Sequence, residues 1–382
     1  MAKICFISSY PPSRGRLSEY AFNLIEEMQR CPMIQQIDIL SDTENSRGSN
    51  QISKKVTVHK TWKFNNPLSL FLIPFSILKI KPNIVHFNVH MAVFGTSRIT
   101  NFIGLFLPIV SRLMGFKTIA TLHNLVEKIN LEKVGFKNSF FNRVSSFFIL
   151  KLIAITSTVT FTLDSYVNLF KERYKSTNVI KIPHGTWRNH VHLNNNYGKY
   201  KKILYIGHSG PYKDIKLLLE TFKIINENRK DVKLVIAGCS HPNYPGYLEE
   251  YSLNNRNKNV YFKGYIPEND LPYLLSNSNV TVLPYYTCTG TSGVAHLASS
   301  YGTPMVATNL PEFQELESEG CGVLLSAHDP LSIALKINEI LDKPQLANNL
   351  RERNLHFAKN RTWNLIASRF CSLYKQIIYN KK

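Results

Sequence analysis

The sequence predicts an α/β protein made of two domains, each built around a parallel sheet. The chain has 382 residues, more than the about 250 to 300 at which a single hydrophobic core usually stops growing. With 44% hydrophobic and 19% charged residues, it can bury a large core. Short apolar runs alternate with longer segments of helical period, and this alternation occurs twice. We therefore expect two Rossmann-like halves.

In the first half, the apolar runs have the length of buried strands and are separated by turn residues or by segments of helical period. The expected strands are Ile4–Ser8, Ile37–Leu40, Val56–Lys60, Ile84–Phe87, Thr118–Leu122, Val159–Thr162 and Val179–Ile182. A helix is expected over Ser18–Gln29. Ser18 is its expected N-cap, because a serine hydroxyl can accept a hydrogen bond from the first helical turn.

The same alternation begins again in the second half. The expected strands are Ile203–Ile206, Lys233–Ala237, Val260–Phe262, Val280–Leu283 and Pro304–Ala307. Helices are expected over Ile215–Asn228, over Leu271–Ser276 and from about Gly293 to Tyr301. From Leu331 the pattern is helical, breaks near Pro344 and ends in the aromatic-rich stretch Trp363–Tyr379.

A polar, asparagine-rich segment without apolar periodicity separates the two halves. It spans residues 186–201 and is typical of a linker. The expected domains are therefore residues 1–185 and 202–360, joined by this linker. A C-terminal helix over residues 361–382 follows them.

The six cysteines and the apolar runs bear on the compartment of the protein. No two cysteines form a CxxC pair, so we interpret them as reduced, mostly buried thiols of a cytoplasmic protein. The first ten residues have the pattern of a strand, and we do not expect secretion. No apolar run reaches the roughly 18 residues that a membrane-spanning helix needs.

The charge is large and unevenly distributed. The formal net charge is +20, and residues 45–126 contain ten Lys and Arg without a single acidic residue. Such a field indicates an anionic partner, which could be a membrane surface, a nucleic acid or a phosphorylated ligand. A basic nucleic-acid-binding protein stays open as an alternative, although the sequence has no recognition-helix, RNP or zinc-finger pattern.

Four turns that follow strands carry candidate site residues, because ligands of open α/β sheets bind beyond the carboxyl ends of the strands. In the first, Gly15 precedes a helix and lets the backbone approach an anion. In the second, His123 ends a strand, where it could bond a substrate hydroxyl or phosphate. In the third, Gly207 and Gly210 precede Lys213, whose charge could meet a diphosphate.

The fourth turn leads from the strand that ends at Pro284 into a helix. It is a run of small residues that offers consecutive N–H groups and hydroxyls at a helix N-terminus, which suits an anion. These residues are Thr289, Gly290, Thr291, Ser292 and Gly293.

No metal site is predicted. His86 and His90 have the i, i+4 spacing of zinc ligands only if they lie on a helix, whereas the sequence places them at the end of a strand. No third ligand is suggested beside them.

With these four turns in this order, the chain resembles the GT-B nucleotide-sugar glycosyltransferases, specifically glycosyltransferase family 4 (glycosyl transferases group 1). The resemblance covers nearly the whole chain and is most specific in the segments KLVIAGCS, NVYFKGYIPENDLPYLLSNSNVTVLPY and GTPMVATNLPEFQEL. It implies two Rossmann-like domains that face a cleft. The donor would bind the C-terminal domain and the acceptor the N-terminal one, and the C-terminal helix would cross back to the N-terminal domain.

The resemblance also implies roles for individual residues. Lys213 and Gly15 would lie near the donor diphosphate, and His123, the implied catalytic residue, would lie beside the transferred sugar. The other implied donor-binding residues are Gly207, His208, Gly290, Thr291, Ser292, Gly293, Val294, His296 and Glu315.

The chain departs from the family pattern at several positions. Thr289 and Leu297 stand where many members have a pair of glutamates, and His208 and Arg16 replace an arginine and a glycine. A subset of the family with an SGV turn is closer to this chain. A catalytically degenerate homologue and a sugar-nucleotide epimerase of the same fold therefore stay open as alternatives.

The implied reaction moves a hexose from UDP- or GDP-hexose to a glycan or lipid-linked acceptor, with retention of the anomeric configuration. Because no DxD motif occurs, we expect no metal and no other cofactor.

Three segments of the implied acceptor domain mix Phe, Leu and Ile with Lys and Arg, as membrane-interfacial helices do. They are residues 67–82, 98–117 and 127–151. We expect a peripheral protein at the cytoplasmic membrane face, with an anionic surface rather than nucleic acid as its partner.

Overall fold

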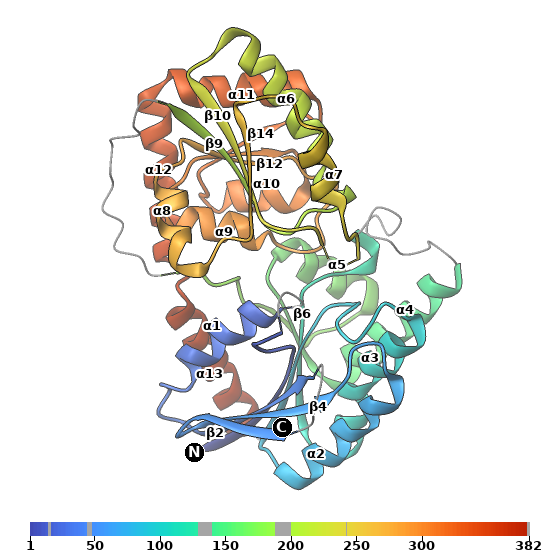
Figure 1. Ribbon diagram of the computed structural model, residues 1–382. Helices are drawn as coiled ribbons and strands as arrows, with labels where there is room; N and C mark the ends of the chain where they lie inside the picture. Colours follow the sequence, from blue (N-terminus) through green and yellow to red (C-terminus); the bar gives the residue numbers. More distant parts are fainter. Residues whose placement is uncertain (14–16, 44–47, 129–139, 188–199, 242, 380–382) are drawn as a thin grey trace. The chain divides into compact units, whose positions relative to one another are not determined.

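The computed structural model describes residues 1–13, 17–43, 48–128, 140–187, 200–241 and 243–379 (Figure 1). These residues form two compact units. The N-terminal unit comprises Met1–Lys128, Asn138–Gly185 and Trp363–Lys382, and the C-terminal unit covers Thr186–Thr362. Each unit has one largely parallel sheet with helices packed on it, so the predicted fold class is confirmed. Gly15, Arg16 and most of the expected linker lie outside the described residues.

The sheet of the N-terminal unit has the strand order β3-β4-β2-β1-β5-β6-β7-β8 among the described residues. In this sheet, every pair of neighbouring strands is parallel except β3 and β4, which are antiparallel. The strands are β1 (Ala2–Ile7), β2 (Ile34–Asp42), β3 (Gly48–Ser53), β4 (Val56–Trp62), β5 (Ile84–Val89), β6 (Lys117–Leu122), β7 (Thr158–Phe161) and β8 (Val179–Lys181).

Helices cover this sheet. They are α1 (Ser18–Met28), α2 (Leu72–Ile80), α3 (Arg98–Leu113), α4 (Phe140–Thr156), α5 (Asp164–Tyr174) and α13 (Trp363–Tyr379), with the 3-10 turns η1 (Pro67–Phe71) and η2 (Val126–Lys128). The last helix of the chain, α13, packs against the first, α1 (Figure 1). As the resemblance implied, the C-terminal helix therefore belongs to the N-terminal unit.

A buried hydrogen-bonded chain holds α13 on the sheet. The hydroxyl of Tyr374 lies 2.6 Å from His86 Nδ1, and His86 Nε2 lies 2.7 Å from the hydroxyl of Thr121. Thr121 in turn bonds the hydroxyl of Thr160 at 2.7 Å. Burial lowers the pKa of His86 to about 3, so its ring is neutral. Both ring nitrogens of His86 are therefore engaged inside the fold.

Two details of the N-terminal unit differ from the sequence prediction. Strand β3 was not predicted, because its polar sequence GSNQIS is almost wholly exposed and carries no apolar pattern. Ser18 was wrongly expected to be the N-cap of the first helix. Leu17, with φ of 72°, is the N-cap, and Ser18 is already helical and buried. The backbone enters the helix from a left-handed conformation, which moves the start by one residue.

The sheet of the C-terminal unit is parallel throughout its described strands, with the order β11-β10-β9-β12-β13-β14. The strands are β9 (Lys201–Ile206), β10 (Val232–Ala237), β11 (Val260–Gly264), β12 (Val280–Leu283), β13 (Met305–Thr308) and β14 (Val323–Ser326). The helices are α6 (Ile215–Asn228), α7 (Tyr247–Asn254), α8 (Leu271–Ser276), α9 (Gly293–Ser300), α10 (Pro311–Ser318), α11 (Pro330–Asp342) and α12 (Pro344–Lys359), with the turns η3 (Pro211–Lys213) and η4 (Glu268–Asp270).

The apolar periodicity of the second half predicted most of these elements but not β14, α7 or α10. The bounds of α6, α8 and β12 agree with the expected ranges, and Pro344 begins α12 after a break behind α11. Proline is tolerated there because the first helical residue needs no N–H donor.

Two further expectations concern the thiols and the membrane. All six cysteines are free, and four of them are buried: Cys5, Cys288, Cys321 and Cys371. Within the described ranges, no helix combines the length and the apolar character needed to cross a bilayer.

Candidate functional site

The third and fourth turns of the sequence prediction meet at the carboxyl edge of the C-terminal sheet, where β9 and β12 are neighbours. Gly207 follows β9 with φ of 122°, a conformation that favours glycine. A Cβ atom added to Gly207 would lie 3.1 Å from Nζ of Lys213 and 3.3 Å from Cγ2 of Val294. The missing side chain of Gly207 thus leaves room in which the Lys213 amine and the first turn of α9 come together.

Lys213 ends the η3 turn just before α6, and aromatic rings surround its amine. Its Nζ lies 5.2 Å from the ring centroid of Tyr285 and 5.9 Å from that of Tyr212. Burial lowers the pKa of Lys213 from 10.5 to about 8. Among the ion pairs of the described residues, none involves Lys213. A cation that is desolvated without a counter-ion is suited to bind an anionic ligand.

The fourth turn forms the N-terminus of α9. Ser292 is its N-cap, and the Ser292 hydroxyl accepts a hydrogen bond from the Ala295 N–H at 3.2 Å. Gly290 has φ of 132°, so the turn requires a glycine there. The first N–H groups of a helix have no partner inside it, and those of Gly293 and Val294 belong to this first turn. They add partial positive charge beside Lys213.

Other donor-site candidates have different environments. His296 is buried, bonds the Thr291 hydroxyl at 3.0 Å and stacks on Phe357 of α12. His296 therefore links Thr291 of the fourth turn to Phe357 of α12. The ring of His208 lies 6.4 Å from that of His241, whose pKa burial lowers to about 4.

In the N-terminal unit, His123 is the first residue after β6 and is almost fully buried. Its Nε2 is 2.7 Å from Oδ1 of Asn88, and its ring meets the ring of Tyr20 at 4.5 Å with an interplanar angle of 80°. Burial, with a smaller contribution from His184, holds the pKa of His123 well below its usual value. The imidazole is therefore neutral, so it can accept a proton or a hydrogen bond but carries no charge for a phosphate.

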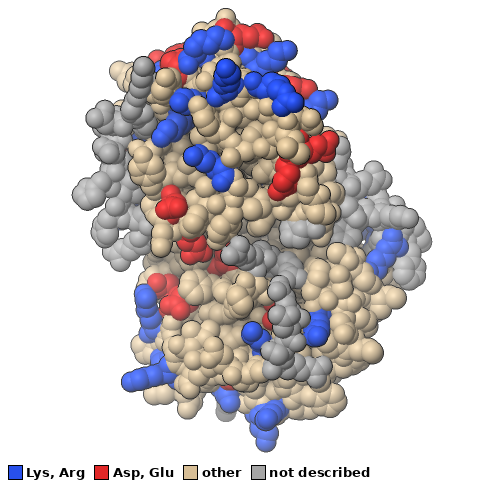
Figure 2. Space-filling model, viewed as in Figure 1, with Lys and Arg blue, Asp and Glu red and all other residues tan. Residues whose placement is uncertain are grey.

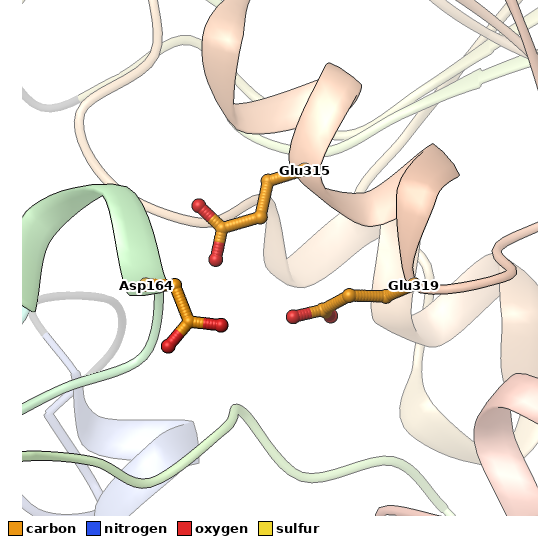
Figure 3. A group of neighbouring side chains, drawn as sticks. All are labelled: Asp164, Glu315 and Glu319. Atoms are coloured by element: carbon orange, nitrogen blue, oxygen red, sulfur yellow. The ribbon is translucent and has the colours of Figure 1, made fainter.

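Three carboxylates are drawn in Figure 3. Glu315 lies on α10 and Glu319 is the C-cap residue of that helix, whereas Asp164 begins α5 (Figure 3). Lys181 pairs with Asp164 at 2.8 Å and Arg361 pairs with Glu319 at 2.8 Å, in each case within one unit. Because Asp164 and the glutamates belong to different units, we derive no metal site from them.

Sequence reasoning missed residues that the structure places at both sites. Tyr212 and Tyr285 enclose Lys213, and Asn88 bonds His123. Asn88 had a recognisable signal, since it is a polar residue inside a strand that is buried at every position. The tyrosines had none, because aromatic residues after a strand are as common in cores as in sites.

Comparisons with known proteins agree with the fold. Residues 189–357 match the model of the family Glycosyl transferases group 1. O-antigen chain mannosyltransferase B of Escherichia coli is 27% identical over 179 residues, which are 45% of this chain and 45% of that protein. The chain matches less than half the length of its curated relatives.

Solved structures resemble the chain over nearly its whole length. Sucrose-phosphate synthase from Thermosynechococcus elongatus is 19% identical, with a TM-score of 0.78 and 99% of both chains covered. HepE from Anabaena in complex with UDP-glucose is 14% identical, with a TM-score of 0.71 and 98% of this chain and 100% of that chain covered. The solved structures share the fold of this chain, and the family match covers most of its C-terminal unit.

Proposed function

We propose that the protein is a glycosyltransferase that moves a hexose from UDP- or GDP-hexose to a glycan or lipid-linked acceptor. The observation that carries this proposal is the desolvated amine of Lys213 beside the N-terminus of α9. An amine and several N–H groups at one place suit a diphosphate. The complexes of HepE with UDP and with UDP-glucose support a nucleotide-sugar donor for a protein of this fold.

In this proposal, the protein's own residues stabilise the leaving group. Negative charge develops on the nucleoside diphosphate as the bond to the sugar breaks, and preorganised donors lower the energy of that state. Lys213 and the N–H groups of Gly293 and Val294 supply them. The transfer is then independent of metal. The acceptor hydroxyl bonds to the sugar on the face that the diphosphate leaves, with retention, and its proton passes to the departing diphosphate. His123 orients the sugar or the acceptor.

A thermal-shift screen with nucleotides and nucleotide-sugars tests the donor. A ligand that binds only the folded protein raises its melting temperature by mass action. We expect UDP or GDP and their hexose derivatives to stabilise the protein, and free hexoses not to. Incubation with the donor alone then tests the two alternatives. Interconversion of the donor sugar indicates an epimerase, and binding without turnover on any acceptor indicates a degenerate homologue.

Donor affinity is expected to fall as the pH rises through about 8. Below this value Lys213 is charged, and above it the free protein loses the proton because burial has lowered the pKa. Binding of a diphosphate favours the charged amine, so the complex takes up a proton, and affinity decreases by up to about tenfold per pH unit. Titration calorimetry in two buffers of different ionisation enthalpy measures this uptake. Lys213→Arg, which stays charged, serves as the control, and a flat affinity profile without proton uptake contradicts the role of Lys213.

We also propose an anionic membrane surface as a partner of the N-terminal unit. Helices α2, α3 and α4 pack side by side. The η1 turn together with α2, and likewise α3 and α4, expose apolar residues besides those that they bury in the core. Within each group, neighbouring exposed residues are about one or three helical turns apart, so they lie along one side of the element. The three groups are Leu68, Phe71, Phe75 and Leu78; Ile99, Phe102 and Leu113; and Phe148, Leu152 and Ile155. We call them the outer stripes.

Exposed Lys and Arg residues lie on or next to the same helices. They are Lys79, Lys81, Arg98, Arg112 and Arg143. Figure 2 shows separate Lys and Arg side chains among largely uncharged surface on the visible face of the N-terminal unit. Apolar side chains enter the boundary of a bilayer while bases contact anionic headgroups, and this combination favours a membrane over a nucleic acid.

Serine at Phe71 and Phe75 is expected to weaken binding to vesicles of anionic phospholipid at least about tenfold, because each ring loses its burial in the bilayer. Both rings are more than half exposed, so their removal takes little packing from the core. Co-sedimentation over a salt series measures the binding. Leu331→Ser with Leu335→Ser, at equally exposed positions of α11, is the matched control. Binding that is unchanged by the phenylalanine substitutions contradicts the proposal, and retention on nucleic acid instead would favour the alternative partner.

A further inference from the structure

A chain of buried hydrogen bonds crosses three neighbouring strands of the N-terminal unit and ends at His123. Strands β1, β5 and β6 are adjacent, and Ser8, Asn88 and His123 stand at or near their carboxyl ends. The Asn88 amide nitrogen donates to the Ser8 hydroxyl at 3.0 Å, and Asn88 Oδ1 lies 2.7 Å from His123 Nε2. Asn88 is fully buried and Ser8 is 1% exposed. The chain is thus built into the sheet.

The direction of these bonds determines where the hydrogen of the imidazole lies. Because the nitrogen of the Asn88 amide donates to Ser8, its oxygen is the atom that faces His123. An amide oxygen only accepts, so Nε2 of the neutral ring must carry the hydrogen. The lone pair of His123 is then on Nδ1.

His86, two residues before Asn88 on the same strand, shows what a purely structural histidine looks like here. Both of its ring nitrogens are bonded, to Tyr374 and to Thr121. Among the described residues, the hydrogen bonds of the His123 ring involve Nε2 alone. One nitrogen of His123 is therefore anchored and the other is left for a ligand.

We propose that Asn88, held by Ser8, is a positioning residue that keeps His123 in the Nε2–H tautomer, so that Nδ1 accepts a hydrogen bond from a hydroxyl of the sugar or the acceptor. The inference rests on the proposed function, in which His123 contacts a substrate. The inference also specifies which group His123 contacts. A neutral ring that offers a lone pair can accept a hydrogen bond from a hydroxyl but not from an ionised phosphate oxygen.

The surroundings of His123 keep the ring in this state. Tyr20 of α1 packs edge-on against it, and His86, His90 and His184 are the charged or titratable groups that act on its pKa besides burial. Each of these histidines opposes a second positive charge, and the pKa of Tyr20 is itself raised by burial, so its phenol stays neutral. No carboxylate among the groups that shift this pKa favours the protonated ring.

Asn88→Asp tests the inference through the pH profile of transfer. A carboxylate at this place can still accept the Nε2 hydrogen, but it favours the imidazolium and raises the pKa of His123. The protonated ring has no lone pair. We expect Asn88→Asp to transfer as fast as the wild type near pH 9 and to lose activity on acidification. The acidic limb of its pH–rate profile should lie at least about one pH unit above that of the wild type. Asn88→Ala, which frees the ring, is expected to lose about 10- to 100-fold in kcat at every pH.

Asn101→Asp is the matched control, because Asn101 is a buried asparagine of the same unit that bonds only backbone groups. It is expected to change the melting temperature and to leave the position of the acidic limb unchanged. If Asn88→Asp also leaves the limb in place while His123→Ala lowers kcat about 10²-fold, the positioning role is wrong and the proposed function stands. Full activity of His123→Ala overturns the role of His123 itself. The nitrogen chemical shifts of His123 in the folded protein report the tautomer without any substrate, and a hydrogen on Nδ1 overturns the inference.

Discussion

Alanine at Lys213 is expected to reduce the rate of transfer by about 10²- to 10³-fold, the effect of removing one preorganised donor from a developing anion. The amine of Lys213 lies in an aromatic enclosure beside the first turn of α9, and the ion pairs of the described residues leave it without a carboxylate. Its charge is therefore available to the leaving diphosphate. Initial rates at saturating donor, together with the donor dissociation constant, measure the loss.

The melting temperature of Lys213→Ala shows whether a loss of activity comes from the binding site or from unfolding. Because the pKa of Lys213 is lowered in the folded protein, the folded state holds its proton less tightly than the unfolded chain does. This unfavourable contribution to stability is fully present below pH 8 and disappears as the pH rises from about 8 to 10.5. At neutral pH, Lys213→Ala should therefore melt no earlier than the wild type.

Lys233 provides a matched control. The Nζ of Lys233 also lies over two tyrosine rings, 3.9 Å from the ring centroid of Tyr200 and 5.1 Å from that of Tyr261. Lys233 lies at the amino end of β10, however, whereas Lys213 lies beyond the carboxyl ends of the strands. Lys233→Ala is expected to keep full activity. Undiminished transfer by Lys213→Ala would remove the main support for a donor diphosphate at this place.

Alanine at His123 is expected to lower kcat by about 10²-fold, the lower end of what a positioned acid–base or orienting group contributes. The ring is neutral and is held by Asn88 and Tyr20, so its loss leaves the reacting sugar or acceptor without a fixed hydrogen-bond partner. Donor affinity should change little, because the proposed diphosphate site belongs to the C-terminal unit. Steady-state kinetics with separate donor titrations distinguish the two effects.

His59 is the control for this substitution. It lies on β4 and bonds Ser49 and Asp38 at the edge of the sheet, and alanine there is expected to leave kcat unchanged. An equal loss in both variants would point to a general effect of losing a histidine from this unit. A loss of donor affinity with unchanged kcat would assign His123 to donor binding instead of to the orientation of the reacting groups.

The fold was predictable because its main signal is local. Buried parallel strands are continuous apolar runs, so β5 and β12 are recognisable without any knowledge of their neighbours. Strand β3 gave no such signal, because a polar edge strand exists only through its pairing with β4. The start of α1 was misplaced for a related reason, since the left-handed Leu17 is determined by how the chain reaches the helix.

The sites were predictable in part. Lys213 and the small residues up to Gly293 are adjacent in sequence to strand ends, and the topology of a parallel sheet brings such ends to one edge. The partners that give these residues their chemistry come from other segments. Tyr285 is remote from Lys213 along the chain, and Asn88 is remote from His123.

The sequence by itself determined the two parallel sheets, the candidate residues at their carboxyl ends and the surplus of positive charge in the first half. Only the tertiary structure decided the protonation states of Lys213 and His123, the anchoring of the imidazole by Asn88, and the outward direction of the stripes on α2, α3 and α4. The physical reason is that a pKa, a tautomer and an exposed face depend on what surrounds a side chain. These surroundings are assembled from residues that are distant in the sequence and adjacent only after folding.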